Sequence, residues 1–489
     1  MSASDTIMMA LLLPLAGAVG ILLASRISAN LREAVTLITA LGTAFTVWSL
    51  IPYEMRGERP SLTLFEIVPG IDIAFAVEPL GMLFGALASG LWIINSIYSI
   101  GYMRGNGESN QTRFYVFFAV SISATLGIAF AGNLFTLFLF YEMLTLATYP
   151  LVSHKGDKKT VRSARIYLGV LLTTSIGLFL PAIIWTYVSV GHGDFVYGGI
   201  IDGHIEGAAI GLLLVLFVFG VGKAAVMPVH RWLPAAMVAP TPVSALLHAV
   251  AVVKAGVFTI TKVIIYIFGI DLLAATPSTD WLLYAAAFTV LAASIVALRQ
   301  QNLKRLLAYS TVAQLSYVVL AVSILTPAAE IGATLHIVAH AFGKITLFFA
   351  AGAIYVASKK TEIPQLAGIG KLMPWTMTAF TIGALSMIGV PPTGGFVSKW
   401  YMLAGALQSD NYVALITIVL STVLNAAYFL PIIYAVWFMP VADSENKAHG
   451  EAPWPMVLAL TLTAILTIAF FLFNASAIEL ESQIFGGWR

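Results

Sequence analysis

Long apolar stretches alternate with short polar turns along almost the whole chain. Each stretch has roughly 20 mostly apolar residues, the length that an α-helix needs to cross the hydrocarbon core of a bilayer. The pattern predicts an all-α polytopic membrane protein with fourteen transmembrane helices. Their expected spans are 6–25, 32–51, 78–100, 113–131, 133–153, 163–190, 208–238, 243–269, 280–299, 303–325, 328–357, 373–408, 411–438 and 453–474.

Two of these segments contain helix breakers near their centres. Segment 208–238 has Met227-Pro228 after Lys223, and segment 373–408 has Pro391-Pro392 before Lys399. Because proline removes a backbone donor, we expect helices 7 and 12 to be discontinuous. The breaks are five helices apart, so helices 4–8 and 9–13 would insert in opposite orientations, as in inverted repeats built around midplane ion sites. The alternative is that the prolines merely bend packed helices.

This reading divides the chain into four regions. Residues 1–112 hold helices 1–3, residues 113–270 the first repeat, residues 279–440 the second repeat, and residues 441–489 the last helix. The outer loop between helices 2 and 3 alternates apolar and polar residues around Pro69-Gly70, which predicts a β-hairpin that serves as a lid or contact element.

Composition and charge agree with a membrane protein. Of the 489 residues, 59% are hydrophobic and 10% are charged, which is too apolar for a water-soluble globule of this size. The absence of cysteine excludes thiolate-bound iron–sulfur clusters, and we expect neither a cofactor nor a metal. With the N-terminus outside, sixteen Lys and Arg residues, Lys447 among them, fall on the inner side against three, Arg489 among them, on the outer side. That asymmetry follows the positive-inside rule and predicts that both termini face outward.

Several ionisable residues lie deep inside the expected spans. They are Glu142, Lys223, Lys254, His336, His340, Lys344 and Lys399. Insertion scales put one charge at the bilayer centre at about 2.5–3.5 kcal/mol, so the carboxylate and four lysines would cost on the order of 12–18 kcal/mol if isolated. One carboxylate cannot neutralise four ammonium groups, so some lysines should be uncharged part of the time, unless neighbouring subunits supply acids. A lysine that can lose its proton is a proton carrier.

Two groups of these residues suggest a proton path. Lys223, beside the seventh-helix break, is the natural partner of Glu142, in an ion pair that either opens and closes or statically joins two helices. His336, His340 and Lys344 stand at i, i+4 and i+8 on one helical face, with about 6 Å between neighbours, a spacing that suits water-bridged hopping. Zinc binding and a purely structural histidine pair are the alternatives.

Other histidines and lysines carry weaker signals. His230 and His248 lie near the inner ends of helices, where His230 is either a relay residue or a helix-end residue. Lys262, close to an outer helix end, can snorkel and is a weak candidate. His192 and His204 fall in an outer loop and are expected to be solvated.

Two motifs resemble a known family. The first is Lys223-Ala-Ala-Val-Met-Pro-Val-His-Arg-Trp-Leu-Pro-Ala-Ala236, continuing through His248 to Lys254, and the second runs from Gly389 through Pro391-Pro392 to Lys399. They resemble the antiporter-like subunits shared by Mrp-type cation/proton antiporters, respiratory complex I and membrane-bound hydrogenases. The resemblance covers nearly the whole chain and implies fourteen helices with two inverted five-helix repeats.

The resemblance also implies roles for the buried residues. Glu142 and Lys223 would form the essential ion pair, Lys254 the central lysine, His336 and His340 the bridge, and Lys399 the terminal exit, with His248, Lys344 and His230 as accessory members of the path.

The chain resembles most the D-type subunit of Mrp Na⁺/H⁺ antiporters. In the family, D-type and N-like subunits carry lysine at the position of Lys399, whereas the M-like subunit usually carries glutamate. The implied function is proton translocation within a multisubunit sodium/proton antiporter of a bacterial cytoplasmic membrane, where the chain would be part of a secondary transporter rather than an enzyme. Implied partners are A-, B-, C-, E-, F- and G-type subunits, H⁺, Na⁺ and the lipid bilayer.

The alternative is a proton-pumping N-like or M-like subunit of complex I or of a hydrogenase. A scaffold without transport has no need for a row of titratable groups. Because a hard cation needs several oxygen ligands and Glu142 is the one deeply buried carboxylate expected, we expect this subunit to carry protons only.

Overall fold

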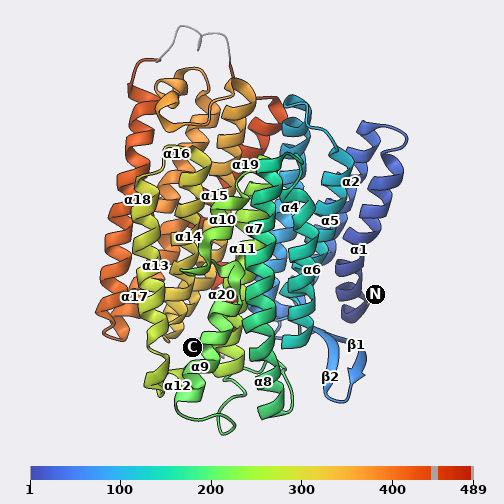
Figure 1. Ribbon diagram of the computed structural model, residues 1–489, viewed down its shortest axis with the longest axis vertical. Coiled ribbons are helices and arrows are strands. Elements are labelled where there is room, and N and C mark those ends of the chain that lie inside the picture. The colour runs from blue at the N-terminus through green and yellow to red at the C-terminus, as the bar shows by residue number, and fades with distance from the viewer. Residues whose placement is uncertain (1, 442–449, 486–489) are drawn as a thin grey trace.

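The computed structural model describes residues 2–441 and 450–485, so Lys447 and Arg489 lie outside the described residues. The chain forms a bundle of long helices with one small hairpin (Figure 1). Twelve helices in the described part are long and apolar enough to cross a membrane. The all-α polytopic membrane fold is therefore confirmed, whereas the count of fourteen stays a prediction because helices 7 and 12 are split into shorter pieces.

The helices of the first half are α1 (Ala3–Ala24), α2 (Ala29–Trp48), α3 (Ile51–Met55), α4 (Pro79–Gly105), α5 (Gln111–Ala129), α6 (Leu134–Val152), α7 (Lys158–Thr174), α8 (Leu180–Val190), α9 (Ala208–Gly220), α10 (Trp232–Ala236) and α11 (Val252–Val263). Those of the second half are α12 (Ile270–Ala274), α13 (Trp281–Leu298), α14 (Leu303–Val322), α15 (Pro327–Ser358), α16 (Pro374–Ile388), α17 (Gly394–Gln408), α18 (Tyr412–Phe438), α19 (Trp454–Leu472) and α20 (Ala475–Ser482). Short helices such as α3, α12 and α20 were not expected from the sequence.

The predicted hairpin is present as strands β1 (Ser61–Val68) and β2 (Ile71–Ala76), which pair antiparallel. Its second strand is joined to the first turn of α6 and to the loop before it, because Ala74 N donates to Thr136 Oγ1 at 3.0 Å and Ala76 N donates to Phe130 O at 2.8 Å. The hairpin therefore contacts helices of its own chain at one end of the bundle (Figure 1). We call this the hairpin end and the opposite end, with the loop 153–157, the basic end.

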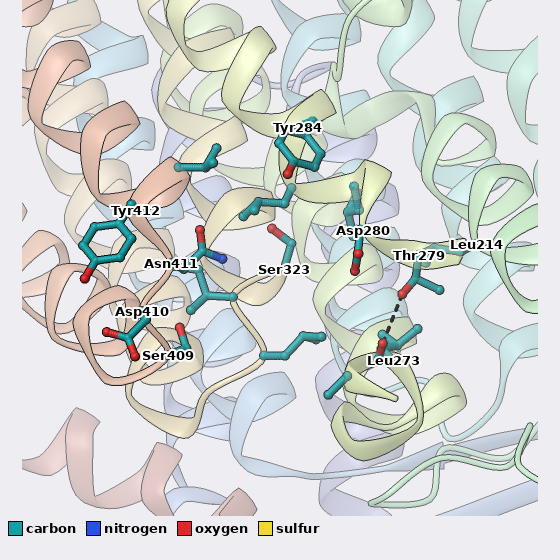
Figure 2. A pocket seen from close by; sticks show the side chains of 16 residues that line it. Leu214, Leu273, Thr279, Asp280, Tyr284, Ser323, Ser409, Asp410, Asn411 and Tyr412 are labelled. Atoms are coloured by element: carbon teal, nitrogen blue, oxygen red, sulfur yellow. Dashed lines mark hydrogen bonds between the residues drawn. The ribbon is translucent and has the colours of Figure 1, made fainter. Parts of the chain in front are cut away.

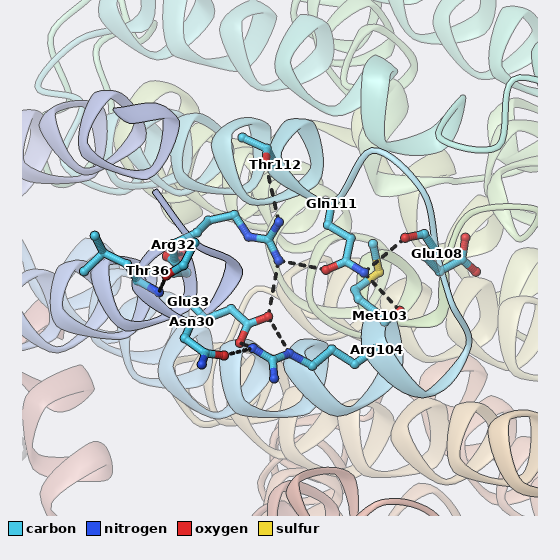
Figure 3. Close-up of polar contacts among 11 residues, drawn as sticks. Asn30, Arg32, Glu33, Thr36, Met103, Arg104, Glu108, Gln111 and Thr112 are labelled. Atoms are coloured by element: carbon cyan, nitrogen blue, oxygen red, sulfur yellow. Dashed lines mark hydrogen bonds and ion pairs between the residues drawn. The ribbon is translucent and has the colours of Figure 1, made fainter. Parts of the chain in front are cut away.

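A polar network fastens the first helices together at the basic end (Figure 3). Arg104 of α4 donates to Glu33 at 2.9 Å and to Asn30 at 2.6 Å, both from α2 and its start. Arg32 donates to Gln111 at the start of α5 at 2.8 Å. Because these groups are mutually paired, the network is a structural clamp between α2, α4 and α5.

Both predicted helix breaks are confirmed. Helix α9 ends at Gly220, a short 3-10 turn η2 (Gly222–Ala224) follows, and Ala225 adopts a left-handed conformation before α10 begins. Helix α16 ends at Ile388, and Gly389 has a φ of +91°, a conformation that favours glycine. Each break thus leaves backbone groups without helical partners near a lysine.

Helix α15 forms the axis of the molecule. It is buried over nearly all of its length and packs against α14, α16, α17 and α19. Next to it, α11 is preceded by a wide π-helical stretch η4 (Val243–Ala251), which is also fully buried. These two central helices carry most of the charged residues predicted from the sequence.

Candidate functional site, a buried row of lysines and histidines

The structure places six of the seven ionisable residues predicted deep in the spans inside the protein. Lys223, Lys254, Lys344, His336, His340 and Lys399 are each at most 5% exposed, so their polar atoms can be satisfied only by protein groups or internal water. Glu142 is partly buried on α6, and its Oε1 has no hydrogen-bond partner.

Lys223 is held by α6 at the first break. Its Nζ donates to Tyr141 O at 2.5 Å and to Thr145 Oγ1 at 2.6 Å, and lies 3.1 Å from the centre of the Tyr141 ring. Among the residues that the structure describes, no ion pair within 4.0 Å joins Lys223 to Glu142. Lys223 thus contacts Tyr141, the residue that precedes Glu142 on α6, but the predicted ion pair between Lys223 and Glu142 is open in this arrangement.

Lys254 and His340 are in direct contact. Lys254 Nζ lies against both His340 Nδ1 and the backbone carbonyl of Ala249. The contact joins α11 of the first half of the chain to α15 of the second half. Because Lys254 Nζ can donate only to an unprotonated Nδ1, the two nitrogens share one proton between them.

Lys254, His340, His336, Ser398 and Lys399 follow one another between α11, α15 and α17, and we call this set the row. Its next part runs from His340 to Lys399. The rings of His340 and His336 are 6.0 Å apart, centre to centre, and Nε2 of each is buried without a hydrogen-bond partner. His336 Nδ1 in turn lies 2.9 Å from Ser398 Oγ, and Ser398 precedes Lys399 on α17. A water between the two rings would satisfy both orphaned nitrogens. A second gap follows, because the Ser398 hydroxyl donates to Gly395 O at 3.1 Å and not to Lys399.

Lys399 is bound by the free end of the broken helix α16. Its Nζ donates to Ile388 O at 2.8 Å, to Met387 O at 3.2 Å and to Thr422 Oγ1 at 3.2 Å. The carbonyl end of a half-helix favours positive charge, so the break at Gly389 creates the ammonium site. A Cβ at Gly389 would lie 2.8 Å from the Lys399 side chain, so the glycine also makes room for it.

The three accessory residues lie around the row and not in it. Lys344 is one turn beyond His340 and donates to Leu307 O of α14 at 3.2 Å. His248 is fully buried among Tyr167 and Trp232, with both ring nitrogens unpartnered. His230 stands apart at the basic end, with its ring 6.2 Å from that of Tyr309.

A second charged cluster, at the hairpin end, was missed in the sequence. Lys262 is 1% exposed and forms an ion pair with Glu78 at 2.7 Å. The expectation that its side chain reaches the membrane surface is therefore wrong. Buried Glu54 pairs with Arg59 at 3.1 Å. Glu481 of α20 is also buried, with neither oxygen hydrogen-bonded, and burial, with the charges of Glu78 and Glu54 nearby, raises its pKa to about 8. The sequence signal for this cluster was weak because its acids lie at the ends of apolar segments, where charged residues are common. These acids are Glu54, Glu78 and Glu481.

The donor set offers little to a metal ion. Among the described residues, no group of three or more His, Asp and Glu side chains lies close enough to hold one. A cleft of about 470 Å³ opens at the hairpin end between α13, α14 and α18 (Figure 2). Its acids are Asp280 and Asp410, and it contains no member of the row.

Comparison with known proteins places this architecture in a family. Residues 131–425 match the family described as NADH:quinone oxidoreductase/Mrp antiporter, TM. The chain is 31% identical over 493 residues to NADH-quinone oxidoreductase subunit N of Desulforudis audaxviator, covering 98% of both. It is also 31% identical to one of the subunits of the Na(+)/H(+) antiporter of Alkalihalophilus pseudofirmus, where the match covers 83% of this chain and 53% of that protein.

Two solved structures share the fold. One is the Mrp complex from Dietzia sp., with a TM-score of 0.86, 21% identity and coverage of 99% of this chain and 97% of the other. The other is an archaeal membrane-bound sulfane sulfur reductase, with a TM-score of 0.86, 23% identity and coverage of 98% and 97%. Because the family match spans more than half of the chain, this protein belongs to the NADH:quinone oxidoreductase/Mrp antiporter transmembrane family.

Proposed function

We propose that this chain translocates protons along the row Lys254, His340, His336, Ser398 and Lys399. The observation that carries the proposal is the contact between Lys254 Nζ and His340 Nδ1, which links the two central helices through groups that both bind and release protons. A purely structural contact would need only this one pair of residues. Here further titratable residues, His336 and Lys399, extend from the pair to the second helix break.

Each step moves one proton between neighbouring groups. Lys254, when protonated, donates its proton to Nδ1 of neutral His340, which then carries the charge. His340 releases its other ring proton from Nε2 through a bridging water to Nε2 of neutral His336, whose Nδ1 faces Ser398. The Ser398 hydroxyl can pass a proton through a second bridging water to Lys399, which must first have lost its own. The Ile388 and Met387 carbonyls then stabilise the new ammonium.

Glu142 and Lys223 would act as a gate at the other end of the row. In the open arrangement, Lys223 is stabilised by the Tyr141 carbonyl and ring. Approach of the Glu142 carboxylate would favour the charged lysine, and its departure would favour proton release. Helix α11 packs directly against the Lys223 backbone, so a change in the position or charge of Lys223 would alter the surroundings of Lys254 on α11.

We propose further that the proton flow is coupled to sodium exchange, in an Mrp-type antiporter where this chain is the D-type subunit, with sodium crossing elsewhere. The full-length fold match to a chain of an Mrp complex supports this assembly. A proton-pumping subunit of an oxidoreductase complex is the second candidate, and the match to nearly all of a subunit N favours it.

One experiment separates the two assemblies. Everted vesicles from cells lacking their own antiporters, expressing the full operon, are followed with a pH-sensitive dye. An antiporter subunit predicts that sodium collapses a preformed pH gradient without any electron donor. A response that appears only after an electron donor is added would contradict sodium antiport and assign the chain to a redox-driven pump.

A further inference from the structure

A large cavity at the basic end is surrounded by cationic side chains from separate segments. It measures about 1010 Å³ and is lined by basic residues of the loop after α6, of α7, of the turn before α10, of α14 and of the loop after α15. They are Lys155, Lys159, Arg231, Lys304, Arg305 and Lys360. Convergence from five segments on one cavity is more than the positive-inside rule requires, because that rule places charges at one side of the membrane without gathering them.

The cationic groups have few counter-charges. No Asp or Glu is among the described residues that line the cavity. In the described part of the chain, no ion pair within 4.0 Å involves Lys155, Lys159, Arg231, Lys304 or Arg305. Lys304 makes one hydrogen bond, to Ala239 O at 2.8 Å, which leaves two of its ammonium protons for a ligand. Mutual repulsion among such groups is relieved by binding an anion.

The shape of the cavity favours an anion that has an apolar tail. On α7, the lining residues Lys159, Ser163, Ile166 and Val170 follow one helical face that changes from basic to apolar away from the basic end. The opposite wall includes Leu303, Ala351 and Tyr355. A phosphate would sit among the lysines and arginines, while an acyl chain continues along Ile166 and Val170 into the hydrocarbon region.

We propose that this cavity is a binding site for the phosphate headgroup of an anionic phospholipid. The charge pattern supplies the phosphate contacts, and the apolar wall distinguishes a lipid from a free phosphate ion. Basic pockets between transmembrane helices bind anionic headgroups in the same way.

The α7 helix provides a matched control for the test. Lys159→Gln with Arg305→Gln removes two charges from the cavity, and Lys158→Gln with Arg162→Gln removes two charges from the same end outside its lining. The purified complex is placed in nanodiscs of phosphatidylcholine with or without phosphatidylglycerol, and retained phosphatidylglycerol is counted by native mass spectrometry. At about 1 kcal/mol per basic residue, the cavity variant should bind phosphatidylglycerol about thirtyfold more weakly than the wild type, and the control should match the wild type.

Two results would overturn the proposal. Equal retention of phosphatidylglycerol by both double variants would show that the cavity charges do not bind it. Displacement of the lipid by millimolar inorganic phosphate would assign the site to a free anion. The wild type should instead keep its lipid in phosphate and lose it only when phosphatidylglycerol is left out of the nanodisc.

Discussion

At the scale of single residues, Lys399 shows how a break in a helix positions a buried lysine. The carbonyls of Met387 and Ile388 have lost their helical donors and bind the ammonium group instead. These two carbonyls and Thr422 Oγ1 would also hold a guanidinium, but an arginine cannot release its proton in a protein. The row therefore depends on the lysine and not on positive charge alone.

Lys399→Arg is expected to lower proton transport at least tenfold while leaving assembly intact. The charge stays and the proton cannot leave, so the last step of the row is blocked. Transport is measured in everted vesicles, and assembly by co-purification of the other subunits. Lys371→Arg, at an exposed position of the basic end, is the matched control. Wild-type transport by Lys399→Arg would show that Lys399 need not be deprotonated.

Glu481 should make stability depend on pH. Burial raises its pKa to about 8, above the value of an unfolded glutamic acid, so the folded state binds the proton more tightly. The stabilisation is present at low pH and is lost as pH rises through about 8. Glu481→Gln should unfold like the wild type near pH 5 and be more stable at pH 9, with an upper bound on the order of 5 kcal/mol.

Thermal unfolding of the purified protein at the two pH values measures this difference. Gln is similar in shape to a protonated Glu, so a loss of stability in the variant at both pH values would mean that Glu481 is held as a carboxylate. Glu479→Gln, two residues earlier on the same helix α20, is the control.

The sequence predicts the members of the row but not their partners. A charge in the middle of an apolar run is conspicuous because water is absent there, which identifies Lys223, Lys254 and Lys399 directly. The acceptors of these lysines are mostly backbone carbonyls and hydroxyls, which every segment contains, so no pattern singles them out. The cluster of Glu78 with Lys262 was missed because charge at a helix end is usually solvated.

At the scale of helices, the close crossing of α11 over the first break fixes the geometry of the row. A Cβ at Gly256 would lie 2.1 Å from Ala224 N and 2.3 Å from Lys223 C, both of them backbone atoms that cannot move aside. Glycine at this point lets the helix that carries Lys254 pass directly against the turn that carries Lys223.

Gly256→Ala should therefore destabilise the protein by more than about 2 kcal/mol and displace Lys254 from His340, with loss of transport. Gly169→Ala, on α7 where no atom lies within 4 Å of the added carbon, should be neutral or slightly stabilising because alanine is the better helix former. Thermal stability and proton flux are measured for both variants. A Gly256→Ala protein as stable and active as the wild type would contradict the crossing.

The ion pair between Glu78 and Lys262 joins the start of α4 to the end of α11. Glu78→Gln leaves a buried ammonium without its carboxylate and should cost about 3–5 kcal/mol. Glu78→Gln with Lys262→Met removes both charges and should recover most of that loss. A double-mutant cycle on thermal unfolding measures the coupling, and strictly additive losses would mean that the pair is not energetically linked.

Helix breaks and the hairpin could be predicted because proline, glycine and strand alternation act locally. The short helices α3 and α20 could not, since each is too short to be stable alone and depends on packing against α4 and α15. The π-helical stretch before α11 also depends on tertiary packing, and nothing in its apolar sequence distinguishes it from an ordinary helix.

At the scale of the whole molecule, the two halves of the chain meet at the row. The first half contributes Lys254 through α11, and the second contributes His340, His336 and Lys399 through α15 and α17. Neither half alone contains a continuous path. This arrangement explains why transport would require the complete fold, and it leaves the driving reaction to the assembly in which the chain resides.

The most direct test of the account replaces the histidine at the junction of the two halves. His340→Gln can still hydrogen-bond to Lys254 but cannot carry a proton, and His192→Gln removes a partly exposed histidine in a loop at the hairpin end, where it contacts Asp194. Proton flux in everted vesicles containing the assembled complex should fall to near background in the first variant and stay at the wild-type level in the second. Wild-type flux through His340→Gln would contradict the central claim, because protons would then be crossing the protein by another route.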